Sequence, residues 1–202
     1  MKKTLVIERS TDNGSVALFD GGECIREAFV DTLPGKGGEW VVKVRDFLQG
    51  EEIGRIVVGT GPGSFAGIRA ALAFAQGYAI GSACEVVGLP SPAAFAPEEG
   101  PLVVLGDARR GMYWIALLDG PKLICPVFQT DAETLPKRVP LGVTIVTPDA
   151  ARIDSFLKET FGEHYAGAAV PLASALGKVA HRNPALLAAE PLPVYLNPAV
   201  RP

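Results

Sequence analysis

The chain of 202 residues has few charged side chains, few cysteines and few histidines. Charged residues make up 20% of the sequence and the formal net charge is −3, so the chain lacks the excess of basic residues that is typical of a nucleic-acid-binding protein. Cys24, Cys84 and Cys125 are far apart, which is typical of reduced core thiols rather than of a disulfide or zinc framework. Neither His164 nor His181 has a cysteine or a second histidine at metal-ligand spacing. We therefore expect no metal site and no tight, direct binding of RNA.

Long hydrophobic runs are also missing. The apolar residues after the two N-terminal lysines end at Glu8, which leaves too short a run for the core of a signal peptide. The most apolar segment, residues 65–80, is shorter than the ~20 residues of a membrane span and contains Arg69 and Gln76. We therefore expect a cytoplasmic protein that has no membrane partner.

Apolar residues nevertheless make up 48% of the chain, which is enough for a substantial core. Turn signals at residues 10–15 and 20–22 separate three short apolar runs, which predicts an antiparallel meander. A helical pattern at residues 39–49, a strand at 56–58, a helix at 65–80 and a strand at 85–88 follow. This order is typical of an α/β fold in which helices pack against a mixed sheet.

A linker-like segment at residues 97–101 predicts two domains, 1–98 and a smaller 99–202. In the second domain, strands are expected on both sides of a charged turn at residues 107–111. Helices are expected at 149–160 and 171–181. The final strand is expected at 191–196, where it can return to the first domain.

The stretch from residue 56 to residue 69 is the most informative part of the chain. An apolar strand ends at a turn, Gly59 to Gly63, that only glycine and proline build easily, and Ser64 is placed to cap the helix that follows. The turn at Gly61, Gly63 and Ser64 has the amide groups and the helix dipole that favour an anion, but no P-loop Lys-Ser or Lys-Thr pair follows. The glycines that a nucleophile elbow needs around Ser64 are also absent.

The helix after this turn is apolar on two opposite sides at ~100° per residue. Small residues lie on one side, and a second apolar set lies opposite. The two sets are Ala66, Ala70, Ala73 and Gly77, and Ile68, Leu72, Ala75 and Ala79. A helix that is apolar all round is buried on every side, so the small-residue side predicts close approach of a second helix, within the chain or from a partner.

Two aspartates suggest a different function, nucleotide binding. Asp12 and Asp107 each end or follow a predicted strand, where a nucleotide-dependent phosphotransferase of the actin and hexokinase class places acidic residues near magnesium. The simpler interpretation is that both are turn residues. A stand-alone nucleotide-binding phosphotransferase or hydrolase that uses Asp12, Asp107 and the turn at Gly61, Gly63 and Ser64 is therefore the alternative hypothesis.

Several motifs resemble the TsaB (YeaZ-like) family. Residues 61–69, G-P-G-S-F-A-G-I-R, are similar to its G-P-G-S-F-T-G-L-R signature. Residues 15–18 (S-V-A-L), 107–113 (D-A-R-R-G-M-Y, for the family's D-A-R-x-x-E-V-Y) and 193–196 (P-V-Y-L) occur in the family's order. The likeness covers nearly the whole chain.

The resemblance implies an ASKHA (actin/hexokinase-like) fold of two lobes, with mixed sheets flanked by helices. It also implies a cytoplasmic, non-catalytic subunit, without a cofactor, for making N6-threonylcarbamoyladenosine at position 37 of tRNA. The implied partners are a TsaD-type catalytic subunit, a TsaE-type ATPase and a second copy of the chain, and no direct tight tRNA binding is expected. Family members pair through their first two helices. The corresponding residues here are Trp40, Val44, Phe47, Ala66, Arg69, Ala70, Ala73, Phe74 and Gly77.

The sequence departs from the family's pattern at several points. Glu8-Arg9-Ser10 replaces the usual D-T-S or D-T-A, Ala66 replaces the signature threonine, and residues 37–39 replace an H-S element. The segment after Asp107 is one residue shorter and lacks an acidic residue. These changes weigh against independent nucleotide binding.

Overall fold

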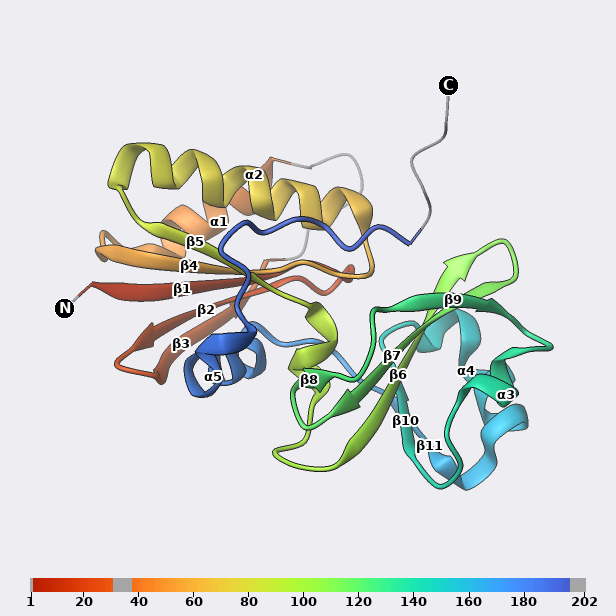
Figure 1. The fold of residues 1–202 in the computed structure, drawn as a ribbon. Coiled ribbons are helices and arrows are strands. Elements are labelled where there is room, and N and C mark those ends of the chain that lie inside the picture. The colour runs from red at the N-terminus through yellow and green to blue at the C-terminus, as the bar shows by residue number, and fades with distance from the viewer. Residues whose placement is uncertain (1, 31–37, 197–202) are drawn as a thin grey trace. The chain divides into compact units, whose positions relative to one another are not determined.

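The computed structural model describes residues 2–30 and 38–196 (Figure 1). The replaced element at residues 37–39 therefore lies partly outside the described residues. The chain forms two compact units, Met1–Ala94 with Pro171–Pro193 and Phe95–Val170 with Val194–Pro202. Each unit is built on one mixed sheet flanked by helices, so the predicted α/β class is confirmed.

The sheet of the first unit has the order β3-β2-β1-β4-β5. The first three strands form the predicted antiparallel meander, and β4 and β5 add to it in parallel. The strands are β1 (Lys3–Glu8), β2 (Ser15–Asp20), β3 (Glu23–Phe29), β4 (Ile53–Gly59) and β5 (Glu85–Leu89). The helices are α1 (Glu39–Leu48), α2 (Phe65–Ser82) and α5 (Ala173–Arg182), with the 3-10 turns η1 (Ser91–Phe95) and η3 (Pro184–Leu186).

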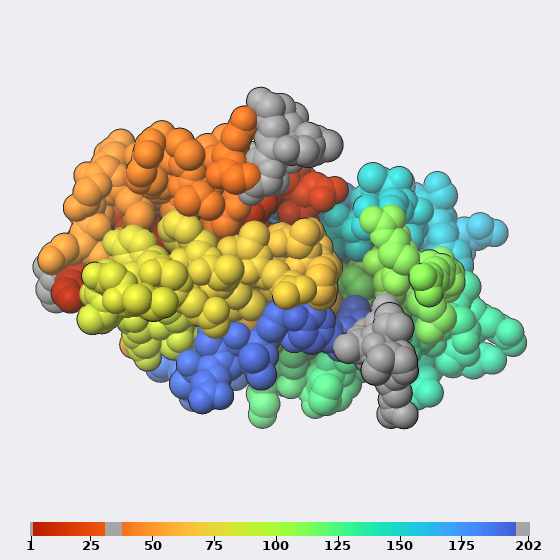
Figure 2. All heavy atoms as spheres, turned by 90° about the horizontal axis from the view of Figure 1, so that it is seen from above, coloured from red at the N-terminus to blue at the C-terminus, as the bar shows by residue number. Residues whose placement is uncertain are grey.

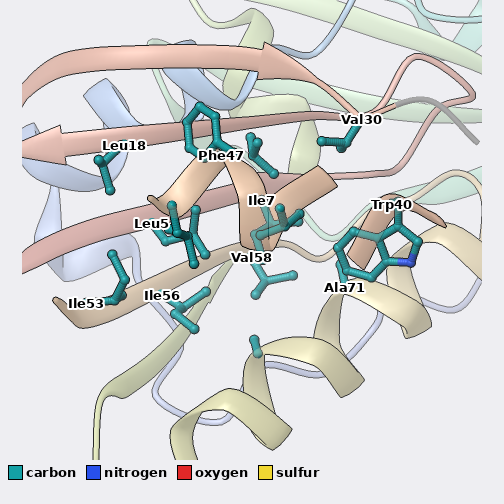
Figure 3. Close-up of a cluster of buried hydrophobic side chains, with 14 of the residues drawn as sticks. Leu5, Ile7, Leu18, Val30, Trp40, Phe47, Ile53, Ile56, Val58 and Ala71 are labelled. Carbon is teal, nitrogen blue, oxygen red and sulfur yellow. The ribbon is translucent and has the colours of Figure 1, made fainter. Parts of the chain in front are cut away.

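Alternation along the strands gives this sheet two apolar faces. Leu5 and Ile7 of β1 join the core under α1 and α2, which Figure 3 shows, whereas Val6 between them joins a second core under α5. The three helices therefore form a layer on each side of the sheet (Figure 1).

The second unit has a sheet of order β11-β10-β6-β7-β8, to which β9 adds by pairing with β7. Its long hairpin, β6 and β7, provides the two strands that were predicted around the charged turn. The strands are β6 (Pro101–Arg109), β7 (Met112–Asp119), β8 (Lys122–Leu123), β9 (Phe128–Asp131), β10 (Thr144–Thr147) and β11 (Tyr165–Ala168). The helices are α3 (Leu135–Arg138), the predicted α4 (Ala150–Phe161) and the 3-10 turn η2 (Gly162–His164).

The C-terminal part of the chain differs from the expected arrangement in two ways. Residues 171–193 belong to the first unit, not to a second domain 99–202, because α5 packs its buried face on the first sheet. Residues 191–196 are not a strand, since Pro191 and Pro193 have no N–H group to donate to a ladder. The chain pairs with the first sheet only at an isolated bridge between Ala188 and Gly88.

Candidate interaction surface and nucleotide-site residues

The glycine turn before α2 is held by hydrogen bonds from within the first unit. The Ser64 amide donates to the Ser10 carbonyl oxygen at 2.6 Å, and the Gly61 amide donates to Ser91 Oγ at 3.0 Å. The Ser64 hydroxyl accepts from the Gly67 amide at 3.3 Å, so the predicted N-cap is confirmed. Three of the amides that would attract a phosphate therefore already have partners.

Two glycines of the signature are needed because α2 begins directly against the β1–β2 turn. A Cβ on Gly63 would overlap the Ser10 carbonyl oxygen, and a Cβ on Gly67 would overlap the Arg9 carbonyl oxygen. Gly63 also has a φ of +150°. These contacts favour the structural interpretation of the turn over an anion site.

Glu8 is buried at the end of β1, where the family has an aspartate. Its Oε1 accepts a hydrogen bond of 2.6 Å from the Ser10 amide, while its Oε2 has no hydrogen-bond partner. Burial raises the pKa of this carboxyl group, although the Ser10 amide and the nearby hydroxyl groups of Ser10 and Ser91 act in the opposite direction. A Cβ on Gly59 would overlap Oε2, so the glycine there makes room for the carboxyl group.

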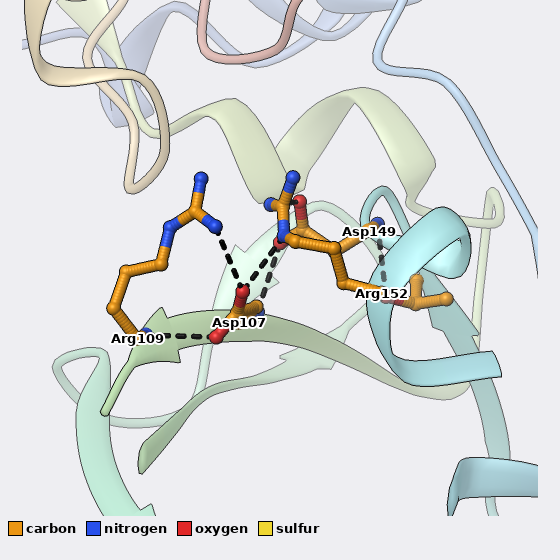
Figure 4. A network of polar contacts seen from close by, with 5 residues as sticks. Asp107, Arg109, Asp149 and Arg152 are labelled. Atoms are coloured by element: carbon orange, nitrogen blue, oxygen red, sulfur yellow. Dashed lines mark hydrogen bonds and ion pairs between the residues drawn. The ribbon is translucent and has the colours of Figure 1, made fainter. Parts of the chain in front are cut away.

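The two aspartates of the alternative hypothesis belong to different units. Asp12 is exposed in the β1–β2 turn of the first unit. Asp107, near the end of β6 in the second unit, accepts from Arg152 Nε at 2.7 Å and from the Arg109 amide at 2.8 Å (Figure 4). Its carboxylate is therefore engaged by two arginines, as expected of a structural turn residue.

Asp149, at the N-terminus of α4, completes the network in Figure 4. It accepts from the Asp107 amide at 2.8 Å and pairs with Arg152. Burial raises the pKa of Asp149, and the Asp107 amide and Arg152 oppose this rise. Sequence reasoning missed both Asp149 and Arg152, because 42 residues separate Asp149 from Asp107 along the chain.

Three of the residues expected at a partner interface lie in the core instead. Trp40, Val44 and Phe47 are at most 9% exposed. All three lie on the buried side of α1, in the core that α1 and α2 share with the first sheet. The Trp40 ring lies 5.3 Å from the ring of Phe74 on α2, and the Arg9 guanidinium lies 4.4 Å above it. Trp40 and Phe74 thus join α1 to α2, so part of the predicted interface is an internal contact.

The remaining expected residues lie on the other side of α2. Ile68, Ala71, Leu72 and Ala75 face the core, and the opposite stripe is exposed. This stripe, called here the outer face of α2, consists of Ala66, Arg69, Ala73, Gln76, Gly77 and Ile80. Ala70 and Phe74 are half-buried at its edge. Figure 2 shows α2 uncovered along its length beside α1.

Two features of the outer face are unusual for a surface helix. The Ile80 side chain is 90% exposed. Gly77 lies in the middle of the helix, where glycine costs about 1 kcal/mol relative to alanine, yet a Cβ there would meet nothing within 4 Å. Nothing within the first unit requires either residue. Ile80 is not among the residues expected at the interface, although it follows Ala73 and Gly77 at helical spacing.

The part of the chain that the structure describes has neither a metal-binding group nor a membrane span. No cluster of three or more His, Cys, Asp or Glu side chains could hold a metal ion within residues 2–30 and 38–196. Over the same residues, no helix has both the length and the apolar character needed to cross a bilayer.

Comparison with known proteins identifies the fold and the relatives. YeaZ from Pseudomonas aeruginosa superimposes with a TM-score of 0.71 at 22% identity, over 97% of this chain and 100% of that one. The chain therefore has the two-sheet ASKHA-type fold of YeaZ. Residues 47–121 match the family model of TsaD, tRNA N6-adenosine threonylcarbamoyltransferase.

Sequence relatives agree with this fold. TsaB of Escherichia coli, a tRNA threonylcarbamoyladenosine biosynthesis protein, is 30% identical over 125 residues, which are 55% of this chain and 53% of TsaB. An uncharacterized protein of Mycobacterium tuberculosis is 34% identical over 87 residues, 42% of this chain and 41% of that protein. The chain thus spans about half or less of the curated relatives it matches. The chain thus resembles TsaB (YeaZ) in its fold and over about half of its sequence, which confirms the predicted resemblance.

Proposed function

We propose that this chain is a non-catalytic subunit that binds a TsaD-type threonylcarbamoyltransferase through the outer face of α2. In this role it supports the formation of N6-threonylcarbamoyladenosine at position 37 of tRNA. The similarity to E. coli TsaB and the match to the TsaD family model support this pathway. The sequence supports a non-catalytic role, because His164 and His181 do not form the H-x-x-x-H motif of the catalytic subunit.

The observation that carries the proposal is the exposed, nearly uncharged outer face of α2. Arg69 is its only charged residue, and the small side chains at Ala73 and Gly77 allow another helix to approach closely. Burying an isoleucine such as Ile80 is worth about 1.5–3 kcal/mol, so a partner that covers it gains substantial binding energy. A surface of this kind is typical of an interaction site.

The same face serves self-association in this proposal. When no TsaD-type subunit is present, two copies pair through α2 about a two-fold axis, and the catalytic subunit then competes with the second copy. A TsaE-type ATPase joins the complex of the two different subunits. Tight direct contact with tRNA by this chain is not part of the proposal, because its net charge is −3.

The test is co-expression with the TsaD homologue of the same genome, followed by light scattering of the purified complex. We expect a complex of at least one copy of each subunit with the wild-type chain. Ala73→Arg should abolish it, because an arginine in a close helix contact buries an unpaired charge at a cost of several kcal/mol. The matched control is Ala151→Arg, which makes the same change at an exposed alanine of α4 in the second unit.

Circular dichroism must show that both variants are folded. A folded Ala73→Arg variant that keeps the heterodimer would contradict the interface. Loss of the complex in both variants would show that added charge, rather than its place on α2, is responsible.

A further inference from the structure

A cleft of about 460 Å³ lies beside the last turn of α5, on the sheet face opposite to α2. The α2 interface does not use it. Its lining comes from the β2–β3 turn with the start of β3, and from α5. The lining residues are Gly22, Glu23, Cys24, Lys178, His181 and Arg182.

The imidazole of His181 forms part of the wall of this cleft. The β2–β3 turn has Gly21 at a φ of +55° and Gly22 at +93°, in the left-handed region that favours glycine. A Cβ on Gly22 would overlap the His181 ring, so the ring lies directly against the backbone of the turn. The absence of a side chain at Gly22 therefore leaves room for the His181 ring.

The other α5 residues bring positive charge to the same place. Lys178, His181 and Arg182 are related by three and four positions, so they share one face of the helix. Cations near a helix C-terminus are stabilised by the helix dipole, which accounts for their presence but not for the cleft they line. Glu23 supplies the only acidic side chain of the lining.

The opposing wall carries the Glu23 carboxylate, and the Glu27 carboxylate also acts on Cys24, where Lys178 counteracts it. Burial raises the pKa of the Cys24 thiol, so the thiol is neutral at physiological pH. The lining thus combines a lysine, an arginine and an imidazole with one carboxylate, that of Glu23. Lysine and arginine are the residues that most often hold phosphate oxygens.

We propose that the cleft between α5 and the β2–β3 turn binds a phosphate group carried by a small molecule. Its volume lies at the lower end of the ~300–1,000 Å³ of small-ligand sites. A small ligand fits better than an RNA backbone, because the net charge of −3 gives the chain no extended basic surface on which RNA could lie. This proposal does not rest on the role of α2.

The test is a titration of the full chain, labelled with nitrogen-15, with inorganic phosphate and separately with AMP. We expect saturable shifts of the amide resonances at residues 22–24 and 178–182. Lys178→Ala should weaken the affinity about tenfold, as expected for loss of one charged hydrogen bond. The matched control, Lys122→Ala, removes the same charge from the exposed strand β8 and should leave the affinity unchanged.

His181→Gln provides a second variant that keeps a hydrogen-bond donor but changes the shape of the wall. It should also weaken binding, because glutamine cannot lie flat against Gly22. Shifts that do not saturate, or equal weakening by Lys178→Ala and Lys122→Ala, would overturn the proposal. Saturable binding of a short RNA in the absence of any response to phosphate and AMP would also overturn it.

Discussion

At the residue scale, Glu8 is a buried acid whose contribution to the free energy of unfolding depends on pH. The residue is 1% exposed, and burial raises the pKa of its carboxyl group above the ordinary value of 4.5. The folded state therefore binds the proton more tightly than the unfolded state, so stability falls as pH rises from about 4.5 through the folded-state pKa. Each tenfold difference in proton affinity between the two states corresponds to about 1.4 kcal/mol.

Glu8→Gln should remove this cost, because glutamine has nearly the same shape and does not ionise. We expect the variant and the wild type to be similar in stability below about pH 4.5, and the variant to be more stable at neutral pH. Urea denaturation of both proteins over this pH range measures the difference. A stability difference that does not change with pH would show that Glu8 keeps an ordinary pKa.

The residue scale is also where sequence reasoning reached its limit. It predicted the Ser64 cap, because capping depends on neighbouring residues alone. It did not predict that Glu8 is buried beside Gly59, since that contact joins two strands. The family resemblance assigned Trp40 to a partner interface, because it maps whole helices and does not say which side of a helix faces the chain's own core.

At the scale of the element, α2 contains Gly77, a residue type that destabilises a helix, at a position with room for a side chain. Gly77→Ala should stabilise the isolated chain by about 0.5–1 kcal/mol, because alanine favours the helix and its Cβ meets nothing within 4 Å. The same methyl group should weaken association with a TsaD-type subunit if that subunit approaches closely at Gly77. Urea denaturation and light scattering of one variant measure the two effects. Lower stability of the isolated chain, or an unchanged complex, would contradict this account of Gly77.

Elements with strong local signals were predicted well, and those that depend on distant partners were not. The meander, α1, α2 and the β6–β7 hairpin have clear periodicity and turns, and all of them formed as expected. The short strands β8 and β9 form because β7 provides hydrogen-bond partners for them. A strand of four or fewer residues is too short to show a pattern of alternating apolar residues in the sequence. The strand expected at 191–196 failed because its prolines outweigh its apolar pattern.

At the scale of the whole molecule, the first unit is assembled from two separate parts of the sequence. α5 comes after the entire second unit, yet it covers one face of the first sheet. Ala173, Leu176 and Ala180 are at most 4% exposed against strand residues that include Val6 and Phe19. A sequence boundary at residue 98 cannot detect this return, because the linker signal is local and the packing of α5 is not.

This arrangement predicts that residues 1–98 do not fold on their own. Without α5, one face of the sheet exposes Val6, Ala17, Phe19 and Val57, which are at most 3% exposed in the full chain. Exposing apolar surface costs about 25 cal/mol for each Å², so about 400 Å² costs about 10 kcal/mol, which is comparable to the whole net stability of a domain. We expect the fragment to show no cooperative thermal transition by circular dichroism. Joining residues 171–193 to it through a flexible linker should restore the transition. A fragment 1–98 that melts cooperatively near the temperature of the full chain would show instead that α5 only rests on a sheet that is already stable.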